Sequence, residues 1–201
     1  QLEVLDLSNN GLTGNIPTTI GQLDFLMDMK LDRNSFSGPI PAQIGDLDSL
    51  IHLDLKENQF NGVIPDAIGN LTTLTELLDL SGNQLSGAIP NSILNLTQLE
   101  QMNLQNNDLE AIPDVTTMNL ASLDIRFNKF LFDDLQPIVL GLPLIYDPQD
   151  SILDLQNLVV PGGGSITLTS ELDCPSGPCI NDFTVYAWYK DGVEVQPPQQ
   201  G

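Results

Sequence analysis

The sequence predicts an α/β solenoid: a right-handed coil of stacked repeats with a parallel sheet on its concave side, followed by part of an all-β sandwich. Three observations lead to this fold class. Asparagine recurs in the frame L-x-L-x-x-N-x-L, at steps of 24, 24, 25, 24 and 21 residues. A second signature, L-x-G-x-I-P, follows the asparagine nearly whole in four repeats. The period ends near residue 130, and strand-like alternation resumes further on.

The first half of each repeat predicts a short strand and a turn. In L-x-L the leucines alternate with outward residues, the pattern of a strand with one buried face. Strands stacked about 4.8 Å apart would give six repeats a strip on the order of 25 Å wide. The asparagine amide can donate and accept hydrogen bonds at once, so it can satisfy backbone groups buried at the turn. We therefore expect a structural ladder of Asn10, Asn34, Asn58, Asn83, Asn107 and Asn128.

The second half of each repeat closes the coil. Gly permits an unusual backbone angle, Ile enters the core, and Pro fixes a turn before a short helical return segment. The I-G-x-L run supplies two more inward apolar groups, and no coil can bury its apolar face without a neighbour. Residues 75–80 carry one extra residue, which we interpret as a bulge, and the fifth repeat has lost its Gly and shortened.

These repeats resemble leucine-rich repeats of the 24-residue L-x-G-x-I-P type, found in plant receptors and bacterial surface proteins. The resemblance covers residues 1–130, which we predict to form about six repeats. Plant members normally begin with a cap bearing paired cysteines, which is missing here, so further repeats upstream are favoured over a fragment boundary. Without a cap we expect an open apolar end at Leu2, Leu5, Leu7 and Leu12.

The remainder of the chain predicts two further segments. Residues 131–160 read as a C-terminal cap and linker, with an apolar lid of Phe132, Leu135, Ile138 and Leu140. Residues 161–201 read as an incomplete immunoglobulin-like β-domain, because Trp188 resembles the core Trp of such sandwiches and Asp191-Gly192 indicates a hairpin. Repeats followed by such a sandwich resemble multidomain bacterial surface proteins.

Composition limits the partners and the compartment. With 27 acidic and 6 basic residues the net charge is −21, so nucleic acid and anionic membranes are poor partners. Solubility explains this acidity better than calcium capture, since no D-x-D-x-D-G loop is present. No run approaches the roughly 18 apolar residues of a membrane span, so no membrane insertion is expected. Cys174 and Cys179 predict a disulfide, and therefore an extracellular or cell-surface protein, with no metal and no cofactor.

Outward strand positions predict the functional surface. His52, between Asp28 and Asp54, could be a base or a metal ligand, but a nucleophile is missing and an ion pair is the favoured reading. Lys30, Arg33, Lys56 and Arg126 allow either cross-strand charge pairing or a mixed-charge recognition strip. We predict that the partner-binding residues of the concave face are Asp28, Lys30, Asp32, His52, Asp54, Lys56, Asp79, Asn103, Gln105 and Arg126.

The sequence thus predicts a non-enzymatic recognition or adhesion module for a protein or glycan ligand. The alternative is a structural spacer or filament subunit that self-assembles through open repeat ends or sandwich edges. The triplet N-L-T at Asn70 and at Asn95 fits the N-glycosylation rule, but the same letters can arise from the repeat consensus.

Overall fold

The computed structural model describes residues 2–130, 144–145, 188–190 and 193–195. The chain divides into two units, Gln1–Ile152 and Leu153–Gly201, which are treated separately below. The predicted apolar lid and the predicted disulfide lie outside the described residues.

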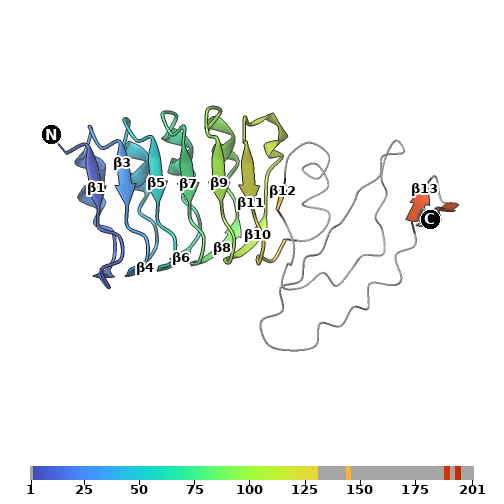
Figure 1. Ribbon diagram of the computed structural model, residues 1–201, viewed down its shortest axis with the longest axis horizontal. Coiled ribbons are helices and arrows are strands. Elements are labelled where there is room, and N and C mark those ends of the chain that lie inside the picture. Colours follow the sequence, from blue (N-terminus) through green and yellow to red (C-terminus); the bar gives the residue numbers. More distant parts are fainter. Residues whose placement is uncertain (1, 131–143, 146–187, 191–192, 196–201) are drawn as a thin grey trace. The chain divides into compact units, whose positions relative to one another are not determined.

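Short parallel strands form the main sheet of the first unit (Figure 1). They are β1 Val4–Asp6, β3 Asp28–Lys30, β5 His52–Asp54, β7 Leu77–Asp79, β9 Gln101–Asn103, β11 Ser122–Asp124 and β12 Leu144–Ile145. Strand order follows chain order, because each coil adds one strand beside the last. In the main-sheet strands β3, β5, β7, β9 and β11 the middle residue is at most 1% exposed, so the period-two pattern predicted the buried face correctly. These residues are Met29, Leu53, Leu78, Met102 and Leu123.

A second parallel sheet of five strands was not predicted from the sequence. Its strands are β2 Thr13–Gly14, β4 Ser35–Gly38, β6 Gln59–Gly62, β8 Gln84–Ala88 and β10 Asp108–Ala111. They correspond to the x-L-x-G part of the signature, where the sequence predicts only an unusual backbone angle at the Gly. The signature Gly adopts positive φ, for example +76° at Gly38, as expected. The fifth repeat lacks this Gly, and there the pairing register shifts between Leu109 and Ala111.

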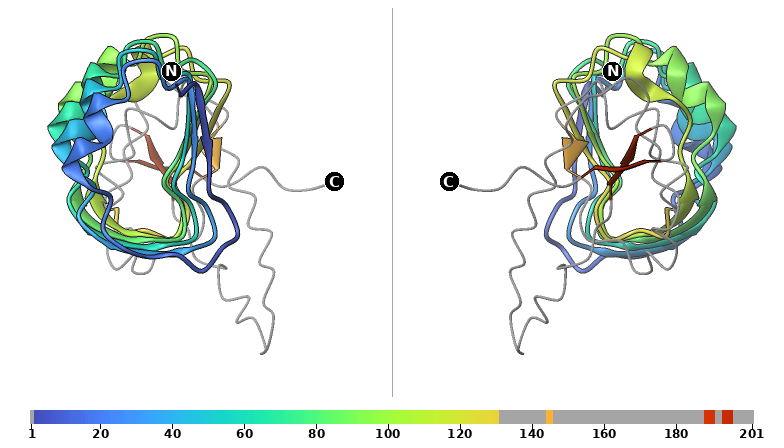
Figure 2. Two further views of the ribbon diagram at one scale, coloured as in Figure 1. Left: turned by 90° about the vertical axis from the view of Figure 1, so that its left-hand side faces the viewer. Right: turned by 90° about the vertical axis from the view of Figure 1, so that its right-hand side faces the viewer.

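The return segments are short 3₁₀ helices on the side away from the main sheet (Figure 2). They are η1 Thr18–Gln22, η2 Ala42–Asp46, η3 Asp66–Asn70, η4 Asn91–Asn95 and η5 Val115–Thr117. The signature Pro is the N-cap of η1 to η4, with φ between −66° and −71°. In η5 the N-cap is Asp114, whose Oδ1 accepts a hydrogen bond from the Thr116 N–H at 3.1 Å.

Glycine in the I-G-x-L run lets successive η helices pack in direct contact. A Cβ atom on Gly45 would lie 2.2 Å from the carbonyl oxygen of Ala67, and one on Gly69 would lie 2.2 Å from that of Ser92. No side chain fits at such distances, because the obstructing atoms are backbone. Leu94 replaces this Gly in η4, where the next helix is only three residues long, and it packs against the core.

The six ladder asparagines form a column in the turns that follow the C-terminal ends of the main-sheet strands. Asn107 is typical: its Nδ2 donates to the carbonyls of Leu80, Leu104 and Gln105 at 3.0–3.3 Å. Its Oδ1 accepts the N–H of Leu85 in the preceding coil at 3.0 Å. Asn34, Asn58, Asn83 and Asn128 make the same links between coils. At the first coil, the Asn10 side chain is exposed and donates only to Leu7 and Ser8.

Two local expectations are also confirmed. The extra residue of the fourth repeat lies just before β7, where the carbonyls of Thr75 and Glu76 accept separate backbone N–H groups, from Glu100 and Gln101. In other coils one carbonyl accepts both N–H groups, as Met27 does, and β7 itself stays in regular pairing with β5 and β9. At the first coil, Leu2 is 46% and Leu12 is 38% exposed, as expected, whereas Leu5 and Leu7 are partly buried and pack against the core.

In the second unit, β13 Trp188–Lys190 and β14 Val193–Val195 pair antiparallel, with Trp188 opposite Val195. This pairing agrees with the hairpin predicted from Asp191-Gly192. The immunoglobulin-like assignment of residues 161–201 stays a prediction.

Candidate functional site: the strand face

Three rows of side chains project outward from the main sheet and the turns that follow it. We call this surface the strand face; it is the face predicted to be concave. The first row is Val4, Asp28, His52, Leu77, Gln101 and Ser122. The second row is Asp6, Lys30, Asp54, Asp79, Asn103 and Asp124. The third row is Ser8, Asp32, Lys56, Ser81, Gln105 and Arg126. All ten residues predicted for partner binding lie in these rows.

The carboxylates of the second row are held by the turn that ends each strand. Oδ1 of Asp54 accepts the backbone N–H of Lys56 at 3.0 Å, and Oδ1 of Asp79 accepts that of Ser81 at 3.0 Å. Asp124 accepts the N–H of Arg126 at 3.2 Å in the same way. Asp54 and Asp79 are only 4% and 5% exposed, whereas Asp6, whose Oδ1 accepts the N–H of Ser8 in the same way, is exposed at the first coil. The second row therefore presents charges in fixed positions.

Each basic residue of the strand face pairs with an aspartate two residues earlier in its own coil. Nζ of Lys30 lies 2.6 Å from Oδ2 of Asp28, and Nζ of Lys56 lies 2.8 Å from Oδ2 of Asp54. Arg126 donates through Nε and Nη2 to both carboxylate oxygens of Asp124.

The expectation of cross-strand pairing is therefore wrong for these three bases. Side chains two residues apart on a strand project to the same side, and in two cases the turn already fixes the carboxylate beside its base. Arg33 does pair across coils, with Glu57 at 3.1 Å, at an exposed site where such a pair is weak.

Burial and pairing shift the pKa of several groups on this face. Loss of solvent raises the pKa of Asp79 above its ordinary value, and the nearby Asp54 charge acts in the same direction. Hydrogen bonds to Asp28 and Asp54 raise the pKa values of Lys30 and Lys56, respectively. A hydrogen bond from the Ser8 hydroxyl lowers the pKa of Asp6 at the exposed end of the second row.

His52 lies in register with Asp28 and Leu77, but its ion-pair partner is neither predicted aspartate. Its Nδ1 lies 3.6 Å from Oε2 of Glu76, a residue that the sequence analysis missed. Within the described residues, its buried Nε2 and Oδ1 of Asp28 have no hydrogen-bond partner. Glu76 belongs to the bulge before β7, so the extra residue of this repeat was the signal for it.

A hollow of about 360 Å³ follows one rim of the strand face, beside the third row. It is lined by Glu57, Ser81, Gly82, Gln105, Asn106 and Phe127. Gly82 stands where other coils carry a side chain in the left-handed region, such as Glu57 at φ 51° and Phe127 at φ 54°. The missing side chain opens the hollow, and Phe127 remains 42% exposed. The S-G-N run at this turn was the sequence signal that we did not use.

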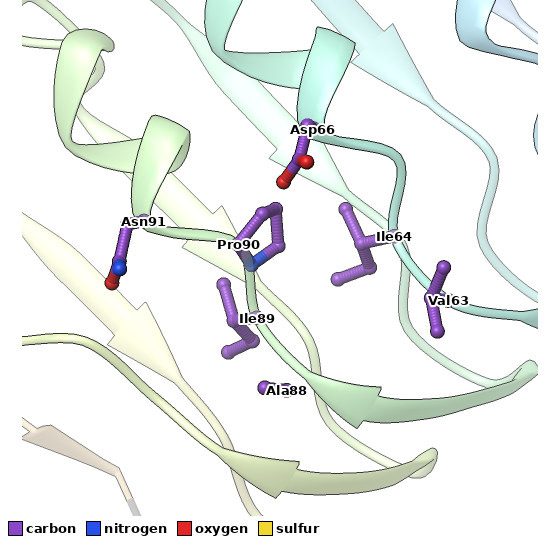
Figure 3. A pocket seen from close by; sticks show the side chains of 7 residues that line it. All are labelled: Val63, Ile64, Asp66, Ala88, Ile89, Pro90 and Asn91. Atoms are coloured by element: carbon purple, nitrogen blue, oxygen red, sulfur yellow. The ribbon is translucent and has the colours of Figure 1, made fainter.

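A second hollow lies away from the strand face, between the I-P turns of the third and fourth coils (Figure 3). It is lined by Val63, Ile64, Asp66, Ala88, Ile89, Pro90 and Asn91. Asp66 is its only charged residue, so it lacks the convergent polar groups of the strand face.

Within the described part of the chain, the His, Cys, Asp and Glu residues form no group of three that could hold a metal ion. None of its helices has the length and hydrophobicity to cross a membrane.

Comparison with known proteins identifies the repeats. A family model described as a leucine-rich repeat region matches residues 1–133. Among solved structures, the ectodomain of the Arabidopsis thaliana receptor kinase GASSHO1/SCHENGEN3, in complex with CASPARIAN STRIP INTEGRITY FACTOR 2, is 35% identical, with a TM-score of 0.65. The ectodomain of the Arabidopsis receptor kinase HAESA, in complex with a peptide hormone, is 39% identical, with a TM-score of 0.61. A plant ice-binding protein is 32% identical, with a TM-score of 0.61.

These similarities cover 73%, 70% and 65% of this chain, respectively. They cover only 18%, 24% and 43% of the other chains, so this chain spans a minor part of each. No curated protein matches the sequence significantly. The resemblance to bacterial surface proteins stays a prediction. Because the family model spans 133 of the 201 residues, the chain belongs to the leucine-rich repeat family.

Proposed function

We propose that this chain is an extracellular, non-catalytic recognition module that binds an extended peptide segment of a protein partner along its strand face. The observation that carries the proposal is the three outward rows, where charged side chains recur at the spacing of one coil and the fifth coil presents amides. Similarity to receptor ectodomains whose structures contain a peptide hormone supports this reading. It also supports the extracellular location.

The dimensions of the strand face suit an extended chain. Six strands at about 4.8 Å span roughly 25 Å, the length of about seven residues in extended conformation. Gln101, Asn103 and Gln105 give the fifth coil three amide side chains, which can donate to and accept from a peptide backbone. The hollow beside Gly82 can receive a side chain at the rim.

Charge favours a basic partner. The three rows contain six aspartates but only three lysine or arginine residues, and the whole chain has a net charge of −21. Each base is already paired with an aspartate, so the net charge of the strand face is negative. Such attraction acts mainly on the association rate and weakens with salt.

A random peptide display library screened against the full chain tests this proposal. We expect enriched peptides to be rich in Lys and Arg. Combined Gln101→Ala, Asn103→Ala and Gln105→Ala changes should weaken the binding of these peptides at least about tenfold, or 1.4 kcal/mol. Combined Gln22→Ala, Asp66→Asn and Asn91→Ala changes on the η side are the matched control and should change Kd less than about twofold. Failure to enrich any peptide, or equal effects of the two sets, would contradict the proposal.

The alternative function, a structural spacer or assembly subunit, stays a prediction. On the first described coil, Leu2 and Val4 are 46% and 55% exposed. Under this reading the chain associates end to end. Sedimentation equilibrium would show association that Leu2→Asp and Val4→Asp abolish and that the fifth-coil substitutions leave unchanged. An adhesive role and a glycan ligand stay predictions.

A further inference from the structure

We propose that Asn70 and Asn95 are acceptor sites for N-linked oligosaccharides. Each begins an N-L-T triplet, the sequence that oligosaccharyl transfer requires in secreted eukaryotic proteins. This inference concerns a chemical modification on the η side of the molecule, and it goes beyond peptide recognition by the strand face.

Both asparagines occupy the same position in adjacent coils. Asn70 is the last residue of η3 and Asn95 is the last residue of η4. Both residues are exposed, as are Thr72 and Thr97, which complete the triplets. The η helices lie on the side of the coil away from the main sheet (Figure 2). An oligosaccharide at either site would therefore extend into solvent without covering the strand face.

The local backbone presents the asparagine side chains at a turn. The N–H of Thr72 donates to the carbonyl of Asn70 at 2.7 Å, and the N–H of Thr97 donates to that of Asn95 at 2.8 Å. Neither asparagine side chain has a hydrogen bond within the described residues, in contrast to the ladder asparagine Asn107. A sugar on the amide nitrogen would thus break no internal contact.

The structure also argues against the alternative that the two N-L-T triplets arise only from the repeat consensus. The equivalent last residues of η1 and η2 are Gln22 and Asp46, and Asp24 and Asp48 stand two positions later. These positions are exposed, so packing does not require Asn or Thr there. The two complete triplets are therefore additions to the repeat frame.

Expression of the full chain behind a secretion signal in insect cells tests the proposal. Intact mass spectrometry of both cell extract and medium should show two oligosaccharide additions, since transfer precedes secretion. Asn70→Gln and Asn95→Gln should each remove one addition, and the double variant should remove both. Thr72→Ala and Thr97→Ala should act in the same way, although they keep the asparagines. Asn61→Gln, at an exposed asparagine outside any triplet, should keep both additions.

Enzymatic release of N-linked glycans supplies the site assignment, because it leaves aspartate at each modified position for peptide mapping. An unmodified polypeptide mass in both fractions would overturn the proposal. Additions that persist in the threonine variants would overturn it as well. Peptide binding measured on the deglycosylated chain is a separate readout, so failure of this inference and failure of the proposed function are distinguishable.

Discussion

The strands and turns of the repeats carry two kinds of positions that behave in opposite ways. At the ladder position, where a coil contacts its neighbour, the residue is Asn in all six coils. On the strand face the residue changes at nearly every coil, and the first row reads Val, Asp, His, Leu, Gln and Ser. Contact between coils thus determines the residue type at the ladder position, whereas the exposed positions of the strand face can vary and can serve recognition.

The ladder shows why the contact positions are fixed. A buried asparagine joins two coils by satisfying three carbonyls and one N–H, and no other side chain places donors and an acceptor in the same geometry. The glycines of η1 to η3 are required for a different reason, which is space. Three predictions test this difference between contact positions and outward positions, from the largest expected effect to the smallest.

Gly69→Ala should produce the largest loss of stability, about 3 kcal/mol, because the new Cβ would meet the backbone of Ser92 at 2.2–2.6 Å. The matched control is Gly11→Ala, where φ is +66° and no atom lies within 4 Å of the new Cβ. Only the conformational cost remains there, about 1 kcal/mol. Urea unfolding of both variants gives the comparison, and equal losses would mean that close packing of the η helices is unimportant.

Asn107→Ala should cost about 2–3 kcal/mol, because the buried N–H of Leu85 in the preceding coil loses its acceptor and three carbonyls each lose one donor. Asn10→Ala should cost less than about 1 kcal/mol, since water replaces the amide at an exposed turn. The free energy of unfolding from urea titration checks both. A similar loss of stability in the two variants would show that burial of the ladder asparagine does not determine its contribution.

Asp79→Asn and Asp6→Asn should change stability in opposite directions at pH 7. The pKa of Asp79 is raised in the folded state, so its stability contribution is greatest below the ordinary carboxyl pKa and is lost as the pH rises through the folded value. Asparagine removes this penalty, and the variant should be more stable.

The pKa of Asp6 is lowered, so its contribution is present above the ordinary pKa and disappears as the pH falls through the folded value. Asp6→Asn should therefore be less stable at pH 7. Both differences should fade in unfolding measurements made below about pH 3, where the carboxyl groups are protonated. Changes of the same sign would contradict the environments described for the two ends of the second row.

The features that are best predicted from the sequence are those that recur in every repeat. The ladder asparagines and the inward leucines could be placed from spacing alone, because each coil imposes the same requirement. The second sheet was missed since x-L-x-G also fits a turn, and only pairing with neighbouring coils makes it a strand.

On the strand face, register placed every predicted residue correctly in its row. It could not give the partner of Lys56, which depends on how the turn orients Asp54, or that of His52, which depends on a bulge. The hollow at Gly82 arises from an absent side chain, which a search for functional groups does not detect.

The central claim is that coil contacts carry the fold while the strand face carries recognition. Photo-crosslinking with a peptide selected from the display library tests it most directly. Benzoylphenylalanine would replace Gln101 on the strand face or Gln22 at the end of η1, two exposed glutamines on different sides of the coil. We expect a peptide adduct from position 101 and none from position 22. An adduct from position 22 alone would contradict the account.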